Sequence, residues 1–281
     1  MLHSNNQPMA KPMKSFFLIT AVLALLGGRV CGADWQLAWA DEFNYQGLPD
    51  PAKWGYEEGF VRNHEAQYYT KARLENARVE NGMLVIEGRK EHYEPAGHPA
   101  VEYTSASLVT KGLEAFQYGR IEMRAKLPQG KGMWPAFWTL GTNIAQIGWP
   151  RCGEDDIMEF VGKDTNHIYG TLHYAVAGQH ASDGGKVEIA VPYDDFHLYA
   201  VEWSPERIDF FVDDQKYHSV DLNKAGKGDE NPFRKPHYLI LNLALGGEWG
   251  GPIDDTILPQ KYLVDYVRVY RKPAAGAGDH P

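Results

Sequence analysis

The chain of 281 residues is 43% hydrophobic, which is enough apolar side chain for one buried core in a single domain. Its formal net charge of −9 argues against nucleic acid and against an anionic membrane surface as partners, whereas a neutral ligand fits this charge. Aromatic residues make up 12% of the chain, and such rings either pack in cores or provide stacking platforms for polysaccharides.

Residues 1–33 have the features of a secretory signal peptide: two lysines precede an apolar run over 16–26, and small residues at 31–33 offer a cleavage site. The apolar run is too short to cross a bilayer as a stable helix. A start at Met13 would serve as well, because the residues before it add nothing that a signal peptide needs. We expect a secreted or periplasmic protein without a membrane partner after cleavage, and a lipid anchor on Cys31 is the rival interpretation.

Beyond residue 33 the sequence carries many strand signals and almost no helix signal. Charged and apolar residues alternate over 119–127 with the period of two that is typical of a half-buried strand. Eight segments are predicted as strands: 35–43, 84–86, 119–127, 168–174, 197–203, 208–212, 238–245 and 263–270. This pattern predicts an all-β sandwich of two sheets in one domain over 34–271, and a disordered Ala/Gly/Pro-rich tail over 272–281. We expect a monomer.

The segment 153–161 reads G-E-D-D-I-M-E-F-V and places four carboxylates within six residues. A solvated acidic face is the usual interpretation, but acids within an apolar, strand-forming run cost free energy unless they have a use. In a regular strand Glu154 and Asp156 share one face, and a β-bulge near 157–158 would return Glu159 to that face. Their carboxyl groups could then approach to about 5–6 Å, the separation of a retaining glycosidase, whereas an inverting enzyme needs a wider gap.

This run resembles the E-x-D-x-M-E signature of glycoside hydrolase family 16, in its laminarinase-like branch. Five further motifs extend the resemblance over nearly the whole chain beyond the signal segment: D-E-F at 41–43, N-H-E-A-Q-Y-Y at 63–69, Y-G-R-I-E at 118–122, G-M-W-P-A-F-W at 132–138 and V-D-Y-V-R-V-Y at 264–270. The resemblance implies a β-jelly roll of two curved antiparallel sheets with a substrate cleft across the concave face. It also implies a secreted, endo-acting enzyme that cleaves β-1,3-glucan with retention of configuration.

The resemblance assigns catalytic roles to three residues and requires no cofactor for the reaction. Glu154 would be the nucleophile, Glu159 the acid/base, and Asp156 the support for the nucleophile. Asp155 departs from the family pattern, which has a branched apolar residue at this position. Strand alternation points Asp155 toward the layer between the two sheets, so we expect it to meet a buried donor or to be protonated at neutral pH.

Four tryptophans are candidates for stacking on sugar rings. Trp134 and Trp138 lie four residues apart and could share a strand face. Core packing is the usual use of such residues, but the resemblance places them in the cleft. Trp149 and Trp249 lie in Gly/Pro-rich stretches, and this composition is typical of loops that border a groove.

Three polar residues complete the expected substrate site. A lone strand histidine is more often structural, yet the resemblance places His173 near the acid/base. Arg120 lies on the polar face of an alternating strand, where a solvated side chain is the simple interpretation. The resemblance instead implies that Arg120 and Asn63 point into the cleft and bind sugar hydroxyls or orient the carboxylates.

A structural calcium ion is also expected, from the resemblance alone. Related enzymes bind one calcium on the convex side, and the corresponding residues here are Glu42, Gly82 and Asp265. Hard oxygen ligands suit this ion. Zinc catalysis is not expected at His64 and Glu65, because no second histidine follows at helical spacing.

Two other functions stay open at this point. The enzyme could act on another β-linked polysaccharide, such as mixed-linkage glucan, xyloglucan or an algal galactan. A jelly roll also serves non-catalytic lectins that bind β-glucan. The presence of both Glu154 and Glu159 favours an enzyme.

Overall fold

The structure is a computed structural model that describes Met1 and residues 35–273. The signal peptide expected over 1–33 lies outside the described residues apart from Met1. The tail expected over 272–281 lies outside them apart from its first two residues.

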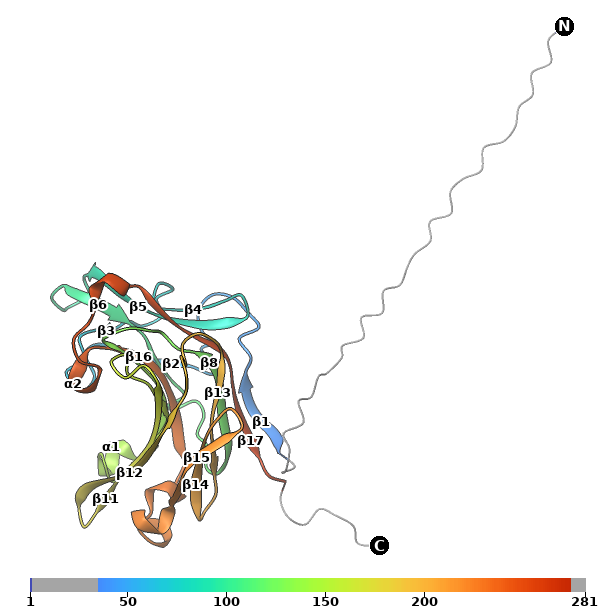
Figure 1. Ribbon diagram of the computed structural model, residues 1–281, viewed down its shortest axis with the longest axis vertical. Coiled ribbons are helices and arrows are strands. Elements are labelled where there is room, and N and C mark those ends of the chain that lie inside the picture. The colour runs from blue at the N-terminus through green and yellow to red at the C-terminus, as the bar shows by residue number, and fades with distance from the viewer. Residues whose placement is uncertain (2–34, 274–281) are drawn as a thin grey trace. The chain divides into compact units, whose positions relative to one another are not determined.

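Two stacked β-sheets form the domain, as predicted (Figure 1). In the described part of the chain the larger sheet has ten strands, in the order β15 (Gln215–Asp221), β14 (Arg207–Val212), β13 (His197–Trp203), β8 (Gly119–Lys126), β17 (Gln260–Arg271), β5 (Met83–Tyr93), β6 (Val101–Ser105) and β3 (Tyr68–Tyr69), with β1 (Gln36–Asp41) on β17 and β4 (Ala77–Glu80) on β5. The strand pairs are antiparallel except for β3 with β6.

The second sheet has seven strands in the described residues, in the order β12 (Gln179–Glu188), β11 (His167–Val176), β10 (Glu154–Glu159), β9 (Met133–Gly141), β16 (His237–Leu245), β7 (Ser107–Val109) and β2 (Gly55–Glu57). Over residues 35–273 helix is confined to short pieces: α1 (Ile144–Ile147), α2 (Gly247–Gly250), η1 (Leu222–Ala225), η2 (Gly228–Glu230), η3 (Pro232–Arg234) and η4 (Asp255–Ile257). All eight predicted strand segments correspond to strands of the two sheets.

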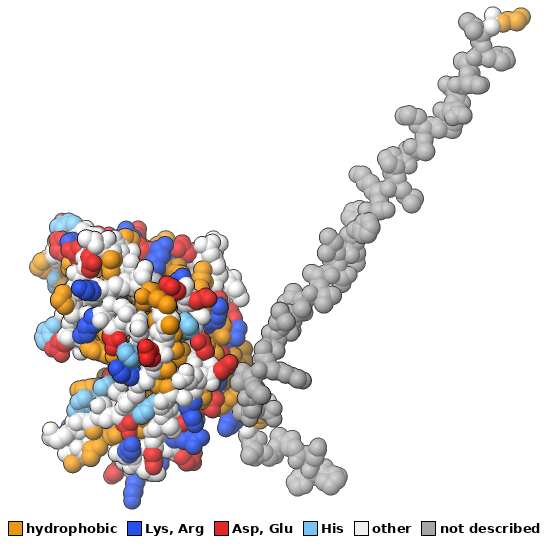
Figure 2. All heavy atoms as spheres, in the orientation of Figure 1, with side chains coloured by type: hydrophobic (Ala, Val, Ile, Leu, Met, Phe, Trp, Pro, Cys, Tyr) orange, Lys and Arg blue, Asp and Glu red, His pale blue; other side chains and the backbone are white. Residues whose placement is uncertain are grey.

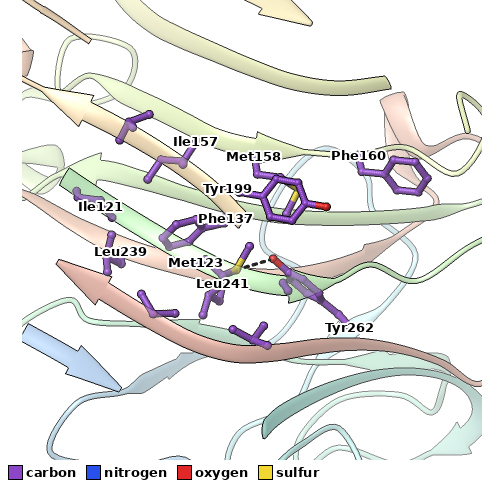
Figure 3. Packing of buried hydrophobic residues seen from close by; sticks show 14 of the residues in the cluster. Ile121, Met123, Phe137, Ile157, Met158, Phe160, Tyr199, Leu239, Leu241 and Tyr262 are labelled. Atoms are coloured by element: carbon purple, nitrogen blue, oxygen red, sulfur yellow. Dashed lines mark hydrogen bonds between the residues drawn. The ribbon is translucent and has the colours of Figure 1, made fainter. Parts of the chain in front are cut away.

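The core lies between the two sheets, and alternation along the strands builds it. In β8, Ile121 and Met123 are fully buried and point inward, as the sequence pattern predicts (Figure 3). Leu239 and Leu241 of β16 face them from the second sheet. Even the hydroxyl of Tyr262 finds a partner here, because it donates to Met123 Sδ at 3.0 Å.

Candidate active site

The strand β10 carries the catalytic candidates, and its irregular register places them. The pairing with β9 shifts between Asp156 and Met158, so one extra residue is inserted there. Ile157 and Met158 therefore both point into the core between the sheets (Figure 3). Glu154, Asp156 and Glu159 share the opposite face and line one cleft. The β-bulge predicted at this place is confirmed.

The cleft has a volume of about 760 Å³ and lies on the outer face of the seven-stranded sheet. Its floor consists of alternate residues of neighbouring strands, such as Trp138 of β9 and Asn242 of β16. Their neighbours Phe137 and Leu241 point the other way, into the core. The same alternation thus supplies the core on one face and the site on the other.

A hydrogen bond from Trp149 and close contacts with His173 hold the Glu154 end of the cleft. The indole Nε1 of Trp149, which follows α1, donates to Glu154 Oε2 at 3.0 Å. His173 lies directly opposite Glu154 on the neighbouring strand β11. Its Nε2 lies 3.1 Å from Asp156 Oδ2 and 4.0 Å from Glu154 Oε1. The imidazole therefore lies between the carboxyl groups of Glu154 and Asp156.

Aromatic side chains surround Glu159. The indole Nε1 of Trp134 donates to Glu159 Oε1 at 2.9 Å. Trp249, on α2, packs edge-on against Trp134 with ring centroids 5.5 Å apart, and against Tyr169 at 5.0 Å. These rings exclude water from one side of Glu159. The carboxyl group therefore lies in a poorly solvated corner of the cleft.

Burial raises the pKa of all three carboxyl groups of the cluster, those of Glu154, Asp156 and Glu159. Desolvation, with a smaller contribution from the neighbouring Asp156, raises the pKa of Glu159 to about 8. Burial and Asp156 also raise the pKa of Glu154, while the imidazole of His173 lowers it. The three acids cannot all be ionised together at neutral pH. The hydrogen bond from Trp149 and the nearby His173 favour the ionised form of Glu154 against this burial. Glu159, with a pKa of about 8, keeps its proton at neutral pH.

Donor atoms of Glu154, Asp156 and His173 lie within 4.8 Å of one another, which is close enough to hold a cation. Each of these groups already has a contact in the acid cluster described above. We therefore assign this spacing to the catalytic arrangement and assign no metal ligands there.

Comparison with known proteins identifies the family. Residues 64–268 match the model of glycosyl hydrolases family 16. The chain belongs to this family. It is a laminarinase-like glycoside hydrolase, as the sequence motifs indicated.

Relatives of this family 16 enzyme include the beta-glucanase of Rhodothermus marinus, which is 44% identical and covers 92% of this chain and 96% of its own length. The X-ray structure of the laminarinase from Rhodothermus marinus is similar with a TM-score of 0.77 and 46% identity, covering 84% of this chain and 97% of the other. A mutant of a non-specific endo-beta-1,3(4)-glucanase with 1,3-beta-D-cellobiosyl-glucose at its active site has a TM-score of 0.79 and 45% identity, with coverages of 86% and 96%.

Trp138 of the family 16 enzyme lies in the cleft floor rather than at its rim. Its side chain is 6% exposed, and its Nε1 donates to Asn242 Oδ1 at 2.7 Å. The guanidinium of Arg62 lies over its ring at 4.8 Å from the centroid. One ring face is therefore covered by Arg62. Trp149 is different, because it is 48% exposed and offers a ring at the cleft edge.

Asn63 lies in the cleft, as predicted, and belongs to a polar group on the loop before β3. Its Nδ2 donates to Glu65 Oε1 at 3.3 Å. Glu65 is buried and also accepts from Gln67 at 2.7 Å and Tyr69 at 2.9 Å. Asn63 adopts a positive φ of 55°, which asparagine tolerates better than most residues.

The prediction that Arg120 points into the cleft is wrong. Arg120 belongs to β8 of the ten-stranded sheet, and the cleft lies on the outer face of the other sheet. Its guanidinium binds Glu122 at 2.8 Å and Glu202 at 3.2 Å. Alternation correctly separated the polar face of this strand from its core face. It did not show which sheet, and hence which outer surface, the strand belongs to.

The residues expected to bind calcium are engaged elsewhere. Glu42 forms a two-point contact with Arg268, at 2.7 and 2.8 Å, and Asp265 binds Arg124 at 2.7 Å. Gly82 lies between β4 and β5. These oxygens suit calcium chemically, and an ion that bound Glu42 and Asp265 would have to displace both arginines. Calcium stays a prediction, and melting with added calcium against a chelator tests it.

Sequence reasoning missed several residues that line the cleft, among them Arg62, Glu65, His180 and Asn242. Asn242 could have been found from the sequence, because a lone amide within the apolar strand 238–245 costs free energy unless it has a hydrogen-bond partner. His180 carried none, since it lies in a polar, Gly-rich segment without apolar alternation.

Proposed function

We propose that this family 16 endo-glucanase acts on β-1,3-glucan of the laminarin type and cleaves it with retention of configuration. The observation that supports the proposal is the bulged strand β10, which presents Glu154 and Glu159 to one cleft in different surroundings. Glu154 is held by Trp149 and lies beside His173, whereas Glu159 lies in an aromatic corner with a pKa of about 8.

The proposed reaction has two steps. Glu159 gives its proton to the glycosidic oxygen while Glu154 attacks C1, so that the leaving chain departs and a glycosyl-enzyme ester forms. Glu159, now ionised, then takes a proton from water, and the water oxygen attacks C1 and releases Glu154. Asp156 supports Glu154 through their shared contact with His173.

The cleft provides the contacts that a glucan chain requires. Trp149 and Trp249 present ring surfaces at the cleft edge and near the acid/base, where they can stack on sugar faces. Asn63 and Glu65 supply polar groups for sugar hydroxyls. Attack within a chain fits a cleft that is open along the sheet rather than a closed pocket.

The anomeric form of the first product tests retention. Proton NMR during the earliest turnover of laminarin is expected to show the β-anomer, and an initial α-anomer would refute the proposal. Glu154→Gln and Glu159→Gln are each expected to lose most turnover, about 10²–10⁴-fold for the acid/base, while they still bind laminarin in affinity electrophoresis. Full activity of either variant would remove its assigned role.

Mixed-linkage glucan is the second candidate substrate. The non-specific endo-beta-1,3(4)-glucanase at 45% identity favours it. A reducing-sugar assay over laminarin, mixed-linkage glucan, xyloglucan and an algal galactan decides between these substrates. Retarded migration in laminarin gels without sugar release on any substrate would instead indicate a lectin.

We also propose that the protein is exported and acts as a monomer. The signal-like segment 1–33 supports export to the periplasm or the medium. None of the helices that the structure describes is long and apolar enough to span a bilayer. N-terminal sequencing of the exported protein and light scattering after size-exclusion chromatography test the two statements.

A further inference from the structure

His180 makes an unusual set of contacts at the nucleophile end of the cleft. It lies at the start of β12, an edge strand of the seven-stranded sheet, just after the turn at Ala177 and Gly178. Its ring stacks on His173 with centroids 5.1 Å apart and planes 20° apart. The ring of His180 also contacts the indole of Trp149, with ring centroids 4.7 Å apart.

A hydrogen bond joins the two histidines. His180 Nε2 lies 2.9 Å from His173 Nδ1, and the opposite nitrogen of His173 faces Asp156 at 3.1 Å. His180 therefore touches both side chains that hold the nucleophile side, since Trp149 donates to Glu154 and His173 lies between Glu154 and Asp156. None of the described contacts of His180 is with a catalytic carboxyl group.

The bond between two imidazole nitrogens holds a single proton, so its direction matters. If His180 Nε2–H donates, neutral His173 carries its own proton on Nε2 and donates to Asp156. If His173 Nδ1–H donates instead, its Nε2 presents a lone pair to the carboxyl group and cannot donate. If both rings are doubly protonated, two N–H groups face each other and the bond is lost. His180 thus controls what His173 offers to Asp156.

Charged groups around the pair favour the first arrangement. Glu154 and Asp156 of β10 face His173 Nε2 at 4.0 and 3.1 Å, and a negative charge on either of them favours a proton on this nitrogen. On the other side, desolvation and His173 lower the pKa of His180, which keeps His180 neutral. A neutral His180 can still donate from Nε2 while its Nδ1 is unprotonated.

We propose that His180 is a positioning residue for the nucleophile: through its hydrogen bond to His173 and its tilted ring contact with Trp149, it fixes the tautomer of His173 and the orientation of the indole that holds Glu154. This inference rests on the proposed function of Glu154. His180 acts through its two neighbours and takes no part in bond making.

Two substitutions separate the hydrogen bond from the ring contact. His180→Phe keeps a ring for stacking but cannot bind His173 Nδ1, and it is expected to lower kcat by about ten- to hundredfold with little change in KM, the size of effect seen when the partner of a functional histidine is removed. His180→Gln can donate an amide N–H to the same atom and should recover part of the loss. The acidic limb of the kcat/KM profile should shift in His180→Phe, which a purely structural residue would not cause.

His92→Phe is the matched control, because His92 is an exposed histidine of β5 outside the cleft. It should leave kcat and the pH profile unchanged. Equal activity of His180→Phe and wild type, with equal melting temperatures, would overturn the inference.

Nitrogen-15 NMR of the imidazoles gives a readout that does not depend on turnover. Wild type is expected to show His173 protonated on Nε2, and His180→Phe a mixture of tautomers. If wild type cleaves none of the glucans, the proposed function fails, yet the tautomer still decides the inference about His180. An unchanged His173 spectrum in His180→Phe would refute it.

Discussion

Asp155 lies fully buried between the sheets, and neither of its carboxyl oxygens has a hydrogen-bond partner among the described residues. Burial raises its pKa well above the ordinary range, which favours the protonated form at neutral pH. The sequence predicted either a buried hydrogen-bond donor for Asp155 or its protonation, and the raised pKa favours protonation. The hydroxyl of Tyr217 also lacks a partner in the described structure. The layer between the sheets therefore contains buried polar atoms of Asp155 and Tyr217 that form no hydrogen bond among the described residues.

Asp155→Ile is expected to stabilise the protein by roughly 1–3 kcal/mol at neutral pH, because it removes poorly paired buried polar atoms. Unfolding exposes the carboxyl group, which then loses its proton above its ordinary pKa. Native stability therefore falls as the pH rises from that value toward the raised pKa, and the gain from the substitution grows over the same window. Urea unfolding at pH 4 and pH 7 measures both effects.

Asp155→Asn separates charge from polarity at the same site. It should remove the part of the pH dependence that Asp155 contributes and gain less stability than Asp155→Ile, while activity stays near wild type in both. Unchanged or lowered stability of Asp155→Ile would show that the carboxyl group has a good partner after all.

The proton on Glu159 sets the alkaline side of the activity profile. Since its pKa is about 8, kcat/KM is expected to fall above that pH by about tenfold per unit as the general acid ionises. Laminarin hydrolysis across pH 5 to 10 measures this limb. An aryl β-glucoside with a good leaving group needs less protonation and should show a weaker limb. A limb that is equally steep for both substrates would assign it to another group.

At the scale of the element, the number of residues in the β10 bulge determines which face of the sheet Glu159 occupies. Deletion of Ile157 removes the extra residue, and the acid/base then lies two steps from Asp156, on the same face. Deletion of both Ile157 and Met158 moves it to the core face. We expect detectable activity in the single deletion and none in the double deletion, although both lose stability through the loss of buried side chains, about 2–5 kcal/mol each.

Melting temperatures show which of the two deletion proteins is folded. Activity in the double deletion, or complete loss in a folded single deletion, would contradict the role of the bulge.

Alternation along the strands predicted which residues face the core, but it did not predict contacts between separate strands. Ile121 and Met123 were placed in the core from their period of two, and the bulge followed from the need to bring two glutamates to one face. The resemblance misplaced Arg120 in the cleft, and alternation could not correct this because it does not reveal which sheet a strand joins. His180 was missed because only the hairpin of β11 and β12 brings it beside His173. Contacts between separate elements were the part that local pattern could not supply.

At the scale of the molecule, the charge distribution limits the substrate. Acidic and basic side chains are mixed over the face seen in Figure 2, and the formal net charge is −9. The cleft adds Glu57 and Glu248 to the catalytic acids, against Arg62 and Lys111. An acidic cleft disfavours anionic polysaccharides.

The KM for laminarin is therefore expected to change less than about twofold between low and high salt, because a neutral chain has no charge to screen. A sulfated galactan should be a poor substrate at low salt and improve as salt screens the repulsion. Kinetic measurements at two ionic strengths check both. Strong salt inhibition with laminarin would point to a charged natural substrate.

The indole groups of Trp134 and Trp149 donate directly to Glu159 and Glu154. The emission of an indole depends on the charge and hydrogen bonding at its N–H. Glu154 and Glu159 are thus each hydrogen-bonded to an intrinsic fluorophore. Single Trp→Phe variants can separate the fluorescence of Trp134 from that of Trp149. Stopped-flow fluorescence without any added dye could then follow the protonation of the acid and the formation of the ester in real time.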